Sequence, residues 1–170
     1  MIKLCAFADE AAANLEEQIN ALHENKIGYI ELRSVAGKNV SEFSFGEQRE
    51  YSARLNSAGI KVWSIGSPLG KIDITCDFDE YKKKIDNIFS LAGIFNCHNV
   101  RIFSFFKAYE KKQRVFDYLR YMAAKAKDSG LNLCHENEKE IYGDILPRVE
   151  EIHENVPGIK LIYGPANYIQ

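Results

Sequence analysis

The segment LCHENEK, residues 133–139, places four polar side chains directly after an apolar run: His135, Glu136, Asn137 and Glu138. A carboxylate held on a rigid strand can bind a divalent metal or transfer a proton, so Glu136 is a candidate metal ligand and a candidate catalytic acid/base group. A solvated loop carboxylate is the competing interpretation. If strand alternation continues this far, His135 points away from Glu136, and a substrate contact and a structural role remain equally open for it.

Further polar residues end or follow the other apolar runs. The candidates for substrate contact, besides His135, are Glu31, Arg33, Ser67, Lys71, Glu138 and Asn167. Glu31 and Arg33 lie two residues apart and point to the same side of a strand, as an ion pair or as substrate contacts.

The segment GSPLGK, residues 66–71, resembles a phosphate-binding loop only in part. Its Gly-Lys pair comes one residue too early, and Ile72 stands where such a loop has Ser or Thr. Phosphate contact and a plain turn both remain open.

These residues lie on an alternation of short apolar runs and longer amphipathic segments. The runs predict strands at residues 2–7, 29–33, 60–65, 99–105, 131–136 and 159–163. The first helix is predicted to begin after an Asn14 cap, and the others span residues 44–57, 78–95, 113–128 and 146–155. Gly59, Gly130 and Gly158 are predicted to end helices just before a strand.

This alternation predicts an α/β fold with parallel strands, either a doubly wound sheet or a (β/α)8 barrel. The first turn, FADEAAAN, lacks the glycine fingerprint of a dinucleotide-binding sheet, which favours the barrel. A complete barrel takes about 250 residues, and this sequence has 170. We therefore predict a single partial domain over residues 1–170 of the TIM-barrel type, apparently truncated after the sixth strand. Open strand edges then predict a homo-oligomer.

Composition narrows the classes of partner. The net charge of −2 is spread along the chain, which favours neither a nucleic-acid partner nor a polybasic membrane patch. No apolar run approaches the roughly 18 residues of a membrane span, and the first residues do not resemble a signal peptide. We expect a cytoplasmic protein. Its four cysteines form no CxxC pair and are expected to be buried and reduced.

Six motifs, in order along the chain, carry a resemblance to a known family. They are FADE (7–10), YIELRS (29–34), SIGSPLGKI (64–72), RIFSFF (101–106), HENEKEIYGD (135–144) and PANYIQ (165–170). Together they resemble the xylose isomerase-like TIM-barrel family, specifically its sugar phosphate isomerase/epimerase members. The resemblance extends over essentially the whole chain.

The resemblance implies a barrel that binds manganese, magnesium, cobalt or zinc through Glu, Asp, His and Glu at the ends of strands five to eight. In that family the metal holds sugar oxygens while carboxylates move a proton between neighbouring carbons through an enediolate. Glu136 matches the strand-five ligand, whereas Gly164 stands at the position of the family's aspartate. The other two ligands would lie beyond residue 170. The resemblance therefore implies weak or absent metal binding in this chain.

Three functions follow from these patterns. The first is metal-dependent proton transfer on a sugar or sugar phosphate, impaired here by the loss of metal ligands. The alternative is a non-catalytic truncated remnant that acts as a binding or assembly module. A weaker hypothesis is an endonuclease of the same superfamily, which the lack of a basic surface disfavours.

Overall fold

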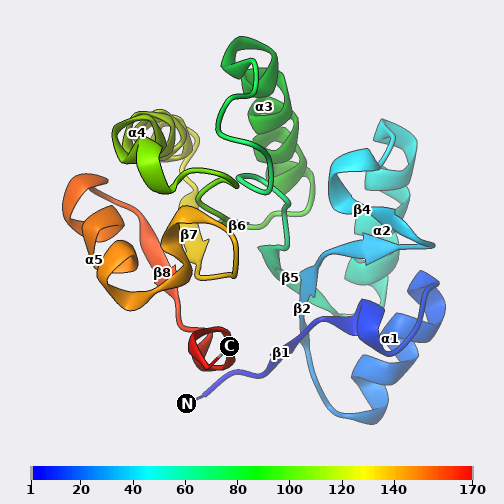
Figure 1. Ribbon diagram of the computed structural model, residues 1–170. Helices are drawn as coiled ribbons and strands as arrows, with labels where there is room; N and C mark the ends of the chain where they lie inside the picture. Colours follow the sequence, from blue (N-terminus) through cyan, green and yellow to red (C-terminus); the bar gives the residue numbers. More distant parts are fainter. Residues whose placement is uncertain (1, 170) are drawn as a thin grey trace. The chain divides into compact units, whose positions relative to one another are not determined.

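Strands and helices succeed one another along residues 2–169, the part of the chain that the computed structural model describes (Figure 1). Gln170, at the end of the sixth motif, lies outside the described residues. The strands of the main sheet are β1 (Cys5–Ala6), β2 (Tyr29–Leu32), β5 (Lys61–Ile65), β6 (Asn99–Ile102), β7 (Asn132–Glu136) and β8 (Lys160–Ile162). The helices are α1 (Leu15–Glu24), α2 (Phe45–Ser57), α3 (Phe78–Ile94), α4 (Lys112–Asp128) and α5 (Leu146–Asn155).

Shorter elements complete the chain. A two-stranded antiparallel hairpin, β3 (Ser34–Val35) and β4 (Lys38–Asn39), follows β2 and was not predicted. Single 3-10 turns are η1 (Ala8–Glu10), η2 (Val40–Glu42), η3 (Tyr109–Lys111), η4 (Tyr142–Asp144) and η5 (Pro165–Tyr168).

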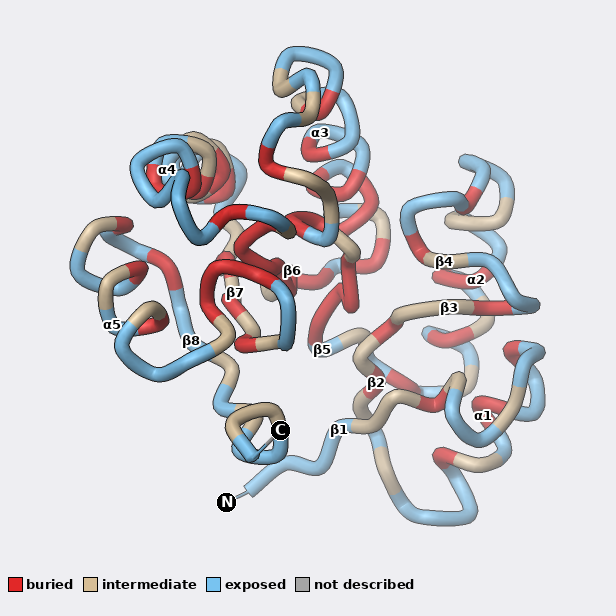
Figure 2. Tube along the Cα trace, in the orientation of Figure 1, coloured by how far each residue is buried: buried red, intermediate tan, exposed pale blue. Residues whose placement is uncertain are grey.

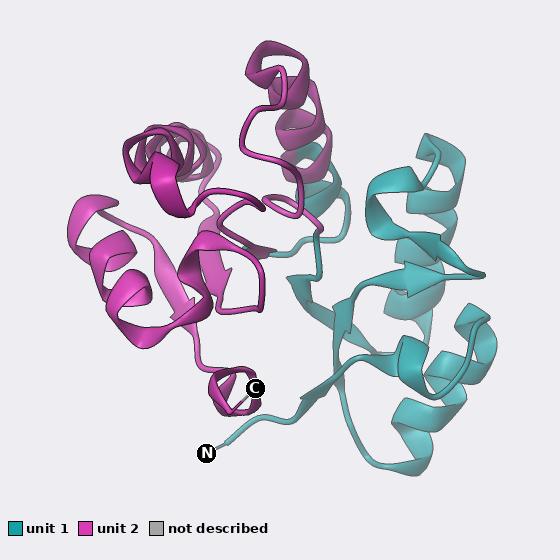
Figure 3. Ribbon diagram, viewed as in Figure 1, with its two compact units in different colours: residues 1–67, 90–99 teal, residues 68–89, 100–170 magenta. Residues whose placement is uncertain are grey.

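The chain divides into two compact units, which Figure 3 colours separately. The first comprises residues 1–67 and 90–99, and the second residues 68–89 and 100–170. In the first unit β1 pairs in parallel with β2, and β2 with β5. In the second unit β6 neighbours β7, which pairs in parallel with β8.

The strands follow chain order without a switch point. At the start of β6, the Asn99 Nδ2 atom donates to the Trp63 carbonyl of β5 over 2.7 Å, within the first unit. A doubly wound sheet reverses its strand order, whereas a barrel keeps adding strands in one direction. This order confirms the predicted α/β fold of the (β/α)8 TIM-barrel type.

The helix ends follow local sequence signals. Asn14 accepts a hydrogen bond from the Glu17 backbone N–H over 2.9 Å, and Ser44 forms a capping box with Glu47 at the start of α2. Gly59 and Gly130 have φ of +72° and +68°, as glycines after helix ends commonly do. The cap hydrogen bonds confirm the predicted starts of α1 and α2, and the positive φ angles confirm the predicted glycine stops after α2 and α4.

Each helix buries one face (Figure 2). In the first unit α1 buries Leu15, Ile19 and Leu22. In the second unit the buried residues of α4 are Val115, Phe116, Leu119, Met122 and Ala126. The three- and four-residue spacing of these side chains is what an amphipathic helix requires. None of the helices in the described residues has the length and apolar character needed to cross a bilayer.

The prediction for the cysteines was wrong in one respect. All four are free thiols, but Cys97 alone is buried, while Cys5 is exposed and Cys76 and Cys134 are half-buried. Cys5 begins the two-residue strand β1, and the three residues before it are exposed as well.

Candidate functional site

Strand β7 extends to Glu136 and alternates strictly between two environments. Leu133, His135 and Asn137 are buried, whereas Glu136 and Glu138 are half-buried. Alternate residues of a strand point to opposite faces of the sheet. His135 therefore points away from Glu136, as the sequence predicted.

An arginine from the neighbouring strand holds the Glu136 carboxylate. The Arg101 Nη1 atom of β6 donates to the Glu136 Oε2 atom over 2.8 Å. The Arg101 side chain is 9% exposed and the Glu136 side chain 17% exposed. A charge-assisted bond between mostly buried groups fixes both side chains in one orientation. This partner was not predicted from the sequence, although Arg101 is a lone cation within the strand Asn99–Ile102.

A second ion pair, between Lys71 and Glu138, lies near the Phe103 ring, and Arg101 lies near this ring as well. The Lys71 Nζ atom donates to the Glu138 Oε2 atom over 3.0 Å. Lys71 Nζ lies 4.2 Å from the centre of the Phe103 ring, and the Arg101 guanidinium lies 5.3 Å from it. Phe103 thus contacts two cations, each paired with a carboxylate at the end of β7. The Lys71 pair is partly exposed, and such pairs contribute only about 0–1 kcal/mol to stability.

Asn137 and Asn167 close the space around Gly164. Asn137 Nδ2 donates to the Gly164 carbonyl over 3.2 Å, and its Oδ1 accepts from the Gly164 N–H over 3.3 Å. Asn167 Nδ2 donates to the Asn137 carbonyl over 2.7 Å. A Cβ atom at position 164 would lie 3.1 Å from Asn137 Oδ1 and 3.2 Å from Asn167 Nδ2. The amide groups therefore fill the space into which a side chain at position 164 would extend.

His135 is a core residue in this structure. Its side chain is fully buried, and neither ring nitrogen has a hydrogen-bond partner among residues 2–169. Burial, and to a smaller extent the charge of His153, lower the pKa of the His135 imidazole to about 3. A Cβ atom at Gly143 would lie 2.6 Å from its Cε1 atom, so the Gly143 backbone covers the ring. Substrate contact by His135 stays a prediction, and in this conformation the ring is covered.

The GSPLGK segment forms a packed turn. In the second unit, Lys71 N donates to the Pro68 carbonyl over 2.9 Å, and Gly70 N donates to the Tyr81 hydroxyl over 2.7 Å. The Gly70 N–H is therefore not available to a phosphate. These contacts favour the plain turn. Ser67, the last residue of this stretch in the first unit, is fully buried.

In the first unit, Arg33 bonds to the FADE segment. Its Nε atom lies 2.7 Å from Asp9 Oδ2, and its Nη2 atom lies 3.2 Å from Glu10 Oε1. The Ser34 hydroxyl donates to the same Asp9 oxygen over 2.6 Å. Asp9 and Glu10 are thus ion-pair partners of Arg33. Glu31 is half-buried, and substrate contact by either residue stays a prediction.

The donor groups present do not fit a divalent metal site. Within residues 2–169, no three His, Cys, Asp or Glu side chains come together as a possible metal cluster. Glu136 is bound by Arg101, Glu138 is bound by Lys71, and position 164 is closed. A divalent ion needs several converging ligands, which these residues do not provide.

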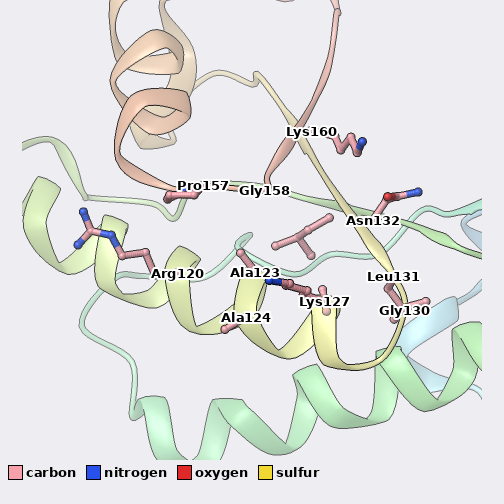
Figure 4. Close-up of a pocket in the computed structure, with 12 residues that line it drawn as sticks. Arg120, Ala123, Ala124, Lys127, Gly130, Leu131, Asn132, Pro157, Gly158 and Lys160 are labelled. Carbon is pink, nitrogen blue, oxygen red and sulfur yellow. The ribbon is translucent and has the colours of Figure 1, made fainter.

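A groove in the second unit lies away from these groups. It has a volume of about 550 Å³ and is lined by Arg120 and Lys127 of α4, the first residues of β7 and β8, and the Pro157-Gly158 turn (Figure 4). Asn132 and Lys160 begin their strands, whereas Glu136 ends one. Ligands of parallel α/β folds bind at the carboxyl ends of strands, so we assign no chemistry to this groove.

Comparisons identify the fold. No protein-family model and no curated protein matches the chain. Among solved structures, the chain is similar to the IOLI protein with a bound zinc atom (13% identity, TM-score 0.77, 98% of this chain and 64% of that one). It is also similar to the probable 3-DHS dehydratase AsbF of Bacillus anthracis (19% identity, TM-score 0.74, 94% and 62%). A third similar structure is a xylose isomerase-like TIM-barrel protein of Mycobacterium smegmatis in complex with magnesium (15% identity, TM-score 0.69, 88% and 56%). The chain spans about three fifths of the length of these proteins.

Proposed function

Starting from its xylose isomerase-like TIM-barrel fold, we propose that the chain binds a sugar or sugar phosphate and carries the acid/base carboxylate of an isomerase or epimerase. The observation that carries this proposal is Glu136, which ends β7 and is held by Arg101. Ligands of TIM barrels meet at the carboxyl ends of strands, where this carboxylate stands.

The proposed chemistry moves a proton between neighbouring carbons. Glu136 takes the proton from the hydroxyl-bearing carbon beside a carbonyl group, which leaves an enediolate. The protonated carboxyl group then returns the proton to the neighbouring carbon, while the hydroxyl proton passes to the former carbonyl oxygen. In an epimerase, a second acid on the opposite face of the sugar would return the proton to the same carbon. Arg101 positions the carboxylate during both steps.

The remaining candidates are proposed as substrate contacts. Lys71 and Asn167 carry N–H donors suited to a phosphate group or to sugar hydroxyls. Glu31, Arg33, Ser67, His135 and Glu138 remain proposed contacts as well. In the family a divalent metal would polarise the sugar oxygens. The donors present here do not fit such an ion, so we propose weak or absent metal binding and route no step through it.

Replacing Glu136 with glutamine tests the proposed role. We expect Glu136→Gln to lower the rate of deuterium exchange from solvent into a ketose or ketose phosphate by about 10²–10⁴-fold, the usual contribution of a general base. Glu140→Gln is the matched control, because it makes the same chemical change at an exposed glutamate four residues further along the chain and is expected to leave the rate little changed. Exchange that persists unchanged in Glu136→Gln would contradict the assignment.

A non-catalytic binding module is the second candidate. Two observations favour this candidate. The Asn137 and Asn167 amides fill the space that a side-chain ligand at position 164 would need, and the Glu136 carboxylate is already paired with Arg101. In that case calorimetry would detect binding of a sugar phosphate, while a broad panel of ketoses and their phosphates would show no deuterium exchange. Binding together with exchange would exclude the module.

We also propose that the chain self-associates, with a second copy covering the apolar side chains on and after β8. Leu161, Tyr163 and Ile169 are 44%, 74% and 85% exposed. Light scattering at micromolar concentration is expected to give at least twice the monomer mass of 19.4 kDa. Leu161→Lys should lower that mass, while Lys160→Glu, a charge change at the adjacent exposed residue, is the control. A wild-type monomer would contradict self-association. A cytoplasmic location, and the absence of nucleic-acid and membrane partners, remain predictions.

A further inference from the structure

Arg101 already provides the counter-charge that a mostly buried carboxylate needs. Removing a carboxylate from water is costly unless a cation and hydrogen bonds replace the lost hydration. The Arg101 Nη1 atom does this for Glu136 over 2.8 Å, and the pair is more than four-fifths buried on each side. A divalent ion bound to Glu136 would lie beside this guanidinium, and the two positive charges would repel each other.

The other side-chain oxygen atoms near the end of β7 that could bind a metal already accept hydrogen bonds from protein groups. The Glu138 carboxylate accepts a hydrogen bond from the Lys71 ammonium group over 3.0 Å, so it is already paired with a positively charged side chain. The Asn137 side-chain oxygen accepts from the Gly164 N–H, and its amide nitrogen donates to the Gly164 carbonyl. These two bonds make the Asn137 amide and the Gly164 backbone a closed pair. A metal at Glu136 would have to break several of these contacts to gain more than one ligand.

We infer that Arg101 takes the place of a divalent cation at Glu136, so that this strand end is a metal-independent site in which a guanidinium positions the carboxylate. The inference rests on the proposed function only for the role of Glu136. It predicts that whatever sugar or sugar phosphate binds here does so equally well in the presence of a chelator.

The first test uses manganese alone with the wild-type chain. We expect calorimetric titration with MnCl₂ to show no binding up to about 1 mM, the weak end of the range for protein sites that bind hard cations. The melting temperature should be the same with EDTA and with MnCl₂. Binding in the micromolar range that Glu136→Gln abolishes would overturn the inference.

The second test isolates the ion pair. Arg101→Met should lower the melting temperature by about 4 °C or more, because it leaves Glu136 without its counter-charge. The double variant Arg101→Met/Glu136→Gln should recover part of this loss, which a loss of packing alone would not do. Lys71→Met is the matched control, since it removes the other cation beside Phe103, and its loss should be smaller. No recovery in the double variant would overturn the inference. Should Arg101→Met fail to fold, the wild-type manganese titration still decides.

Different experimental results would contradict the proposed function and this inference. Absent deuterium exchange together with a flat manganese titration contradicts the isomerase and supports the metal-independent site. Exchange that EDTA abolishes supports the isomerase and overturns the inference.

Discussion

Replacing Gly70 with alanine is expected to lower the free energy of unfolding by about 2–5 kcal/mol, the sum of left-handed backbone strain and overpacking. Gly70 has φ of +87°, and a Cβ atom there would lie 2.0 Å from the Phe103 carbonyl oxygen and 2.4 Å from its carbon. The atoms in the way belong to the backbone, so no side chain can rotate to make room.

Hydrogen bonds on both sides prevent the two segments from separating. Phe103 N donates to the Leu69 carbonyl over 2.7 Å, and Phe105 N donates to the Gly70 carbonyl over 2.9 Å. Relief of the clash therefore requires breaking at least one of these bonds. It would also move Phe103, the ring beside Arg101 and Lys71.

Gly130→Ala is the matched control for Gly70→Ala. Gly130 lies in the same unit and has a similar φ of +68°, but a Cβ atom there would meet nothing within 4 Å. Gly130→Ala is therefore expected to lower the free energy of unfolding only by the backbone strain, about 1–2 kcal/mol. Urea unfolding of the two variants measures both losses. Equal losses would show that close approach to Phe103 does not determine the need for glycine at position 70.

The helices were predictable because their ends are specified locally. The span 146–155 was predicted as observed, and the others differ by one residue at an end. Caps such as Asn14 and stops such as Gly130 act within one turn of the helix, so they can be identified without knowing the fold.

Strand lengths and strand partners were harder to predict. The apolar run at residues 2–7 predicted a strand of six residues, but β1 includes only Cys5 and Ala6. Pairing depends on what the neighbouring strand offers, which the run itself does not contain. The β3–β4 hairpin was missed because its turn uses Ala36, with φ of +52°, where Asn, Asp or Gly is usual.

In the candidate site too, local features could be predicted from the sequence, whereas contacts between distant residues could not. The opposite directions of His135 and Glu136 follow from alternation along a single strand, and this was predicted. The bonds from Arg101 to Glu136 and from Arg33 to Asp9 join residues 35 and 24 positions apart. Such partners depend on how the elements pack, and neither pair has a spacing that reveals it in the sequence.

The burial of His135 is expected to make the protein sensitive to mild acid. The pKa of the imidazole is 6.5 in the unfolded chain and about 3 in the folded protein, mainly because burial disfavours its charged form. Below pH 6.5 the unfolded chain therefore binds a proton that the folded protein does not. The stabilisation is complete above pH 6.5 and falls by about 1.4 kcal/mol for each pH unit below it. Urea unfolding at a series of pH values between 6.5 and 5 measures this slope.

His135→Leu is expected to reduce that slope, because leucine binds no proton in either state. Neither ring nitrogen has a partner among the described residues, so an apolar side chain of similar size loses no hydrogen bond and should leave stability at pH 7 little changed. His98→Gln, at an exposed histidine, should keep the wild-type slope. The comparison is restricted to pH above 5 because carboxylates begin to titrate below it. Parallel slopes for the wild type and His135→Leu would mean that His135 becomes protonated in the folded protein, which would require the Gly143 backbone to move off the ring.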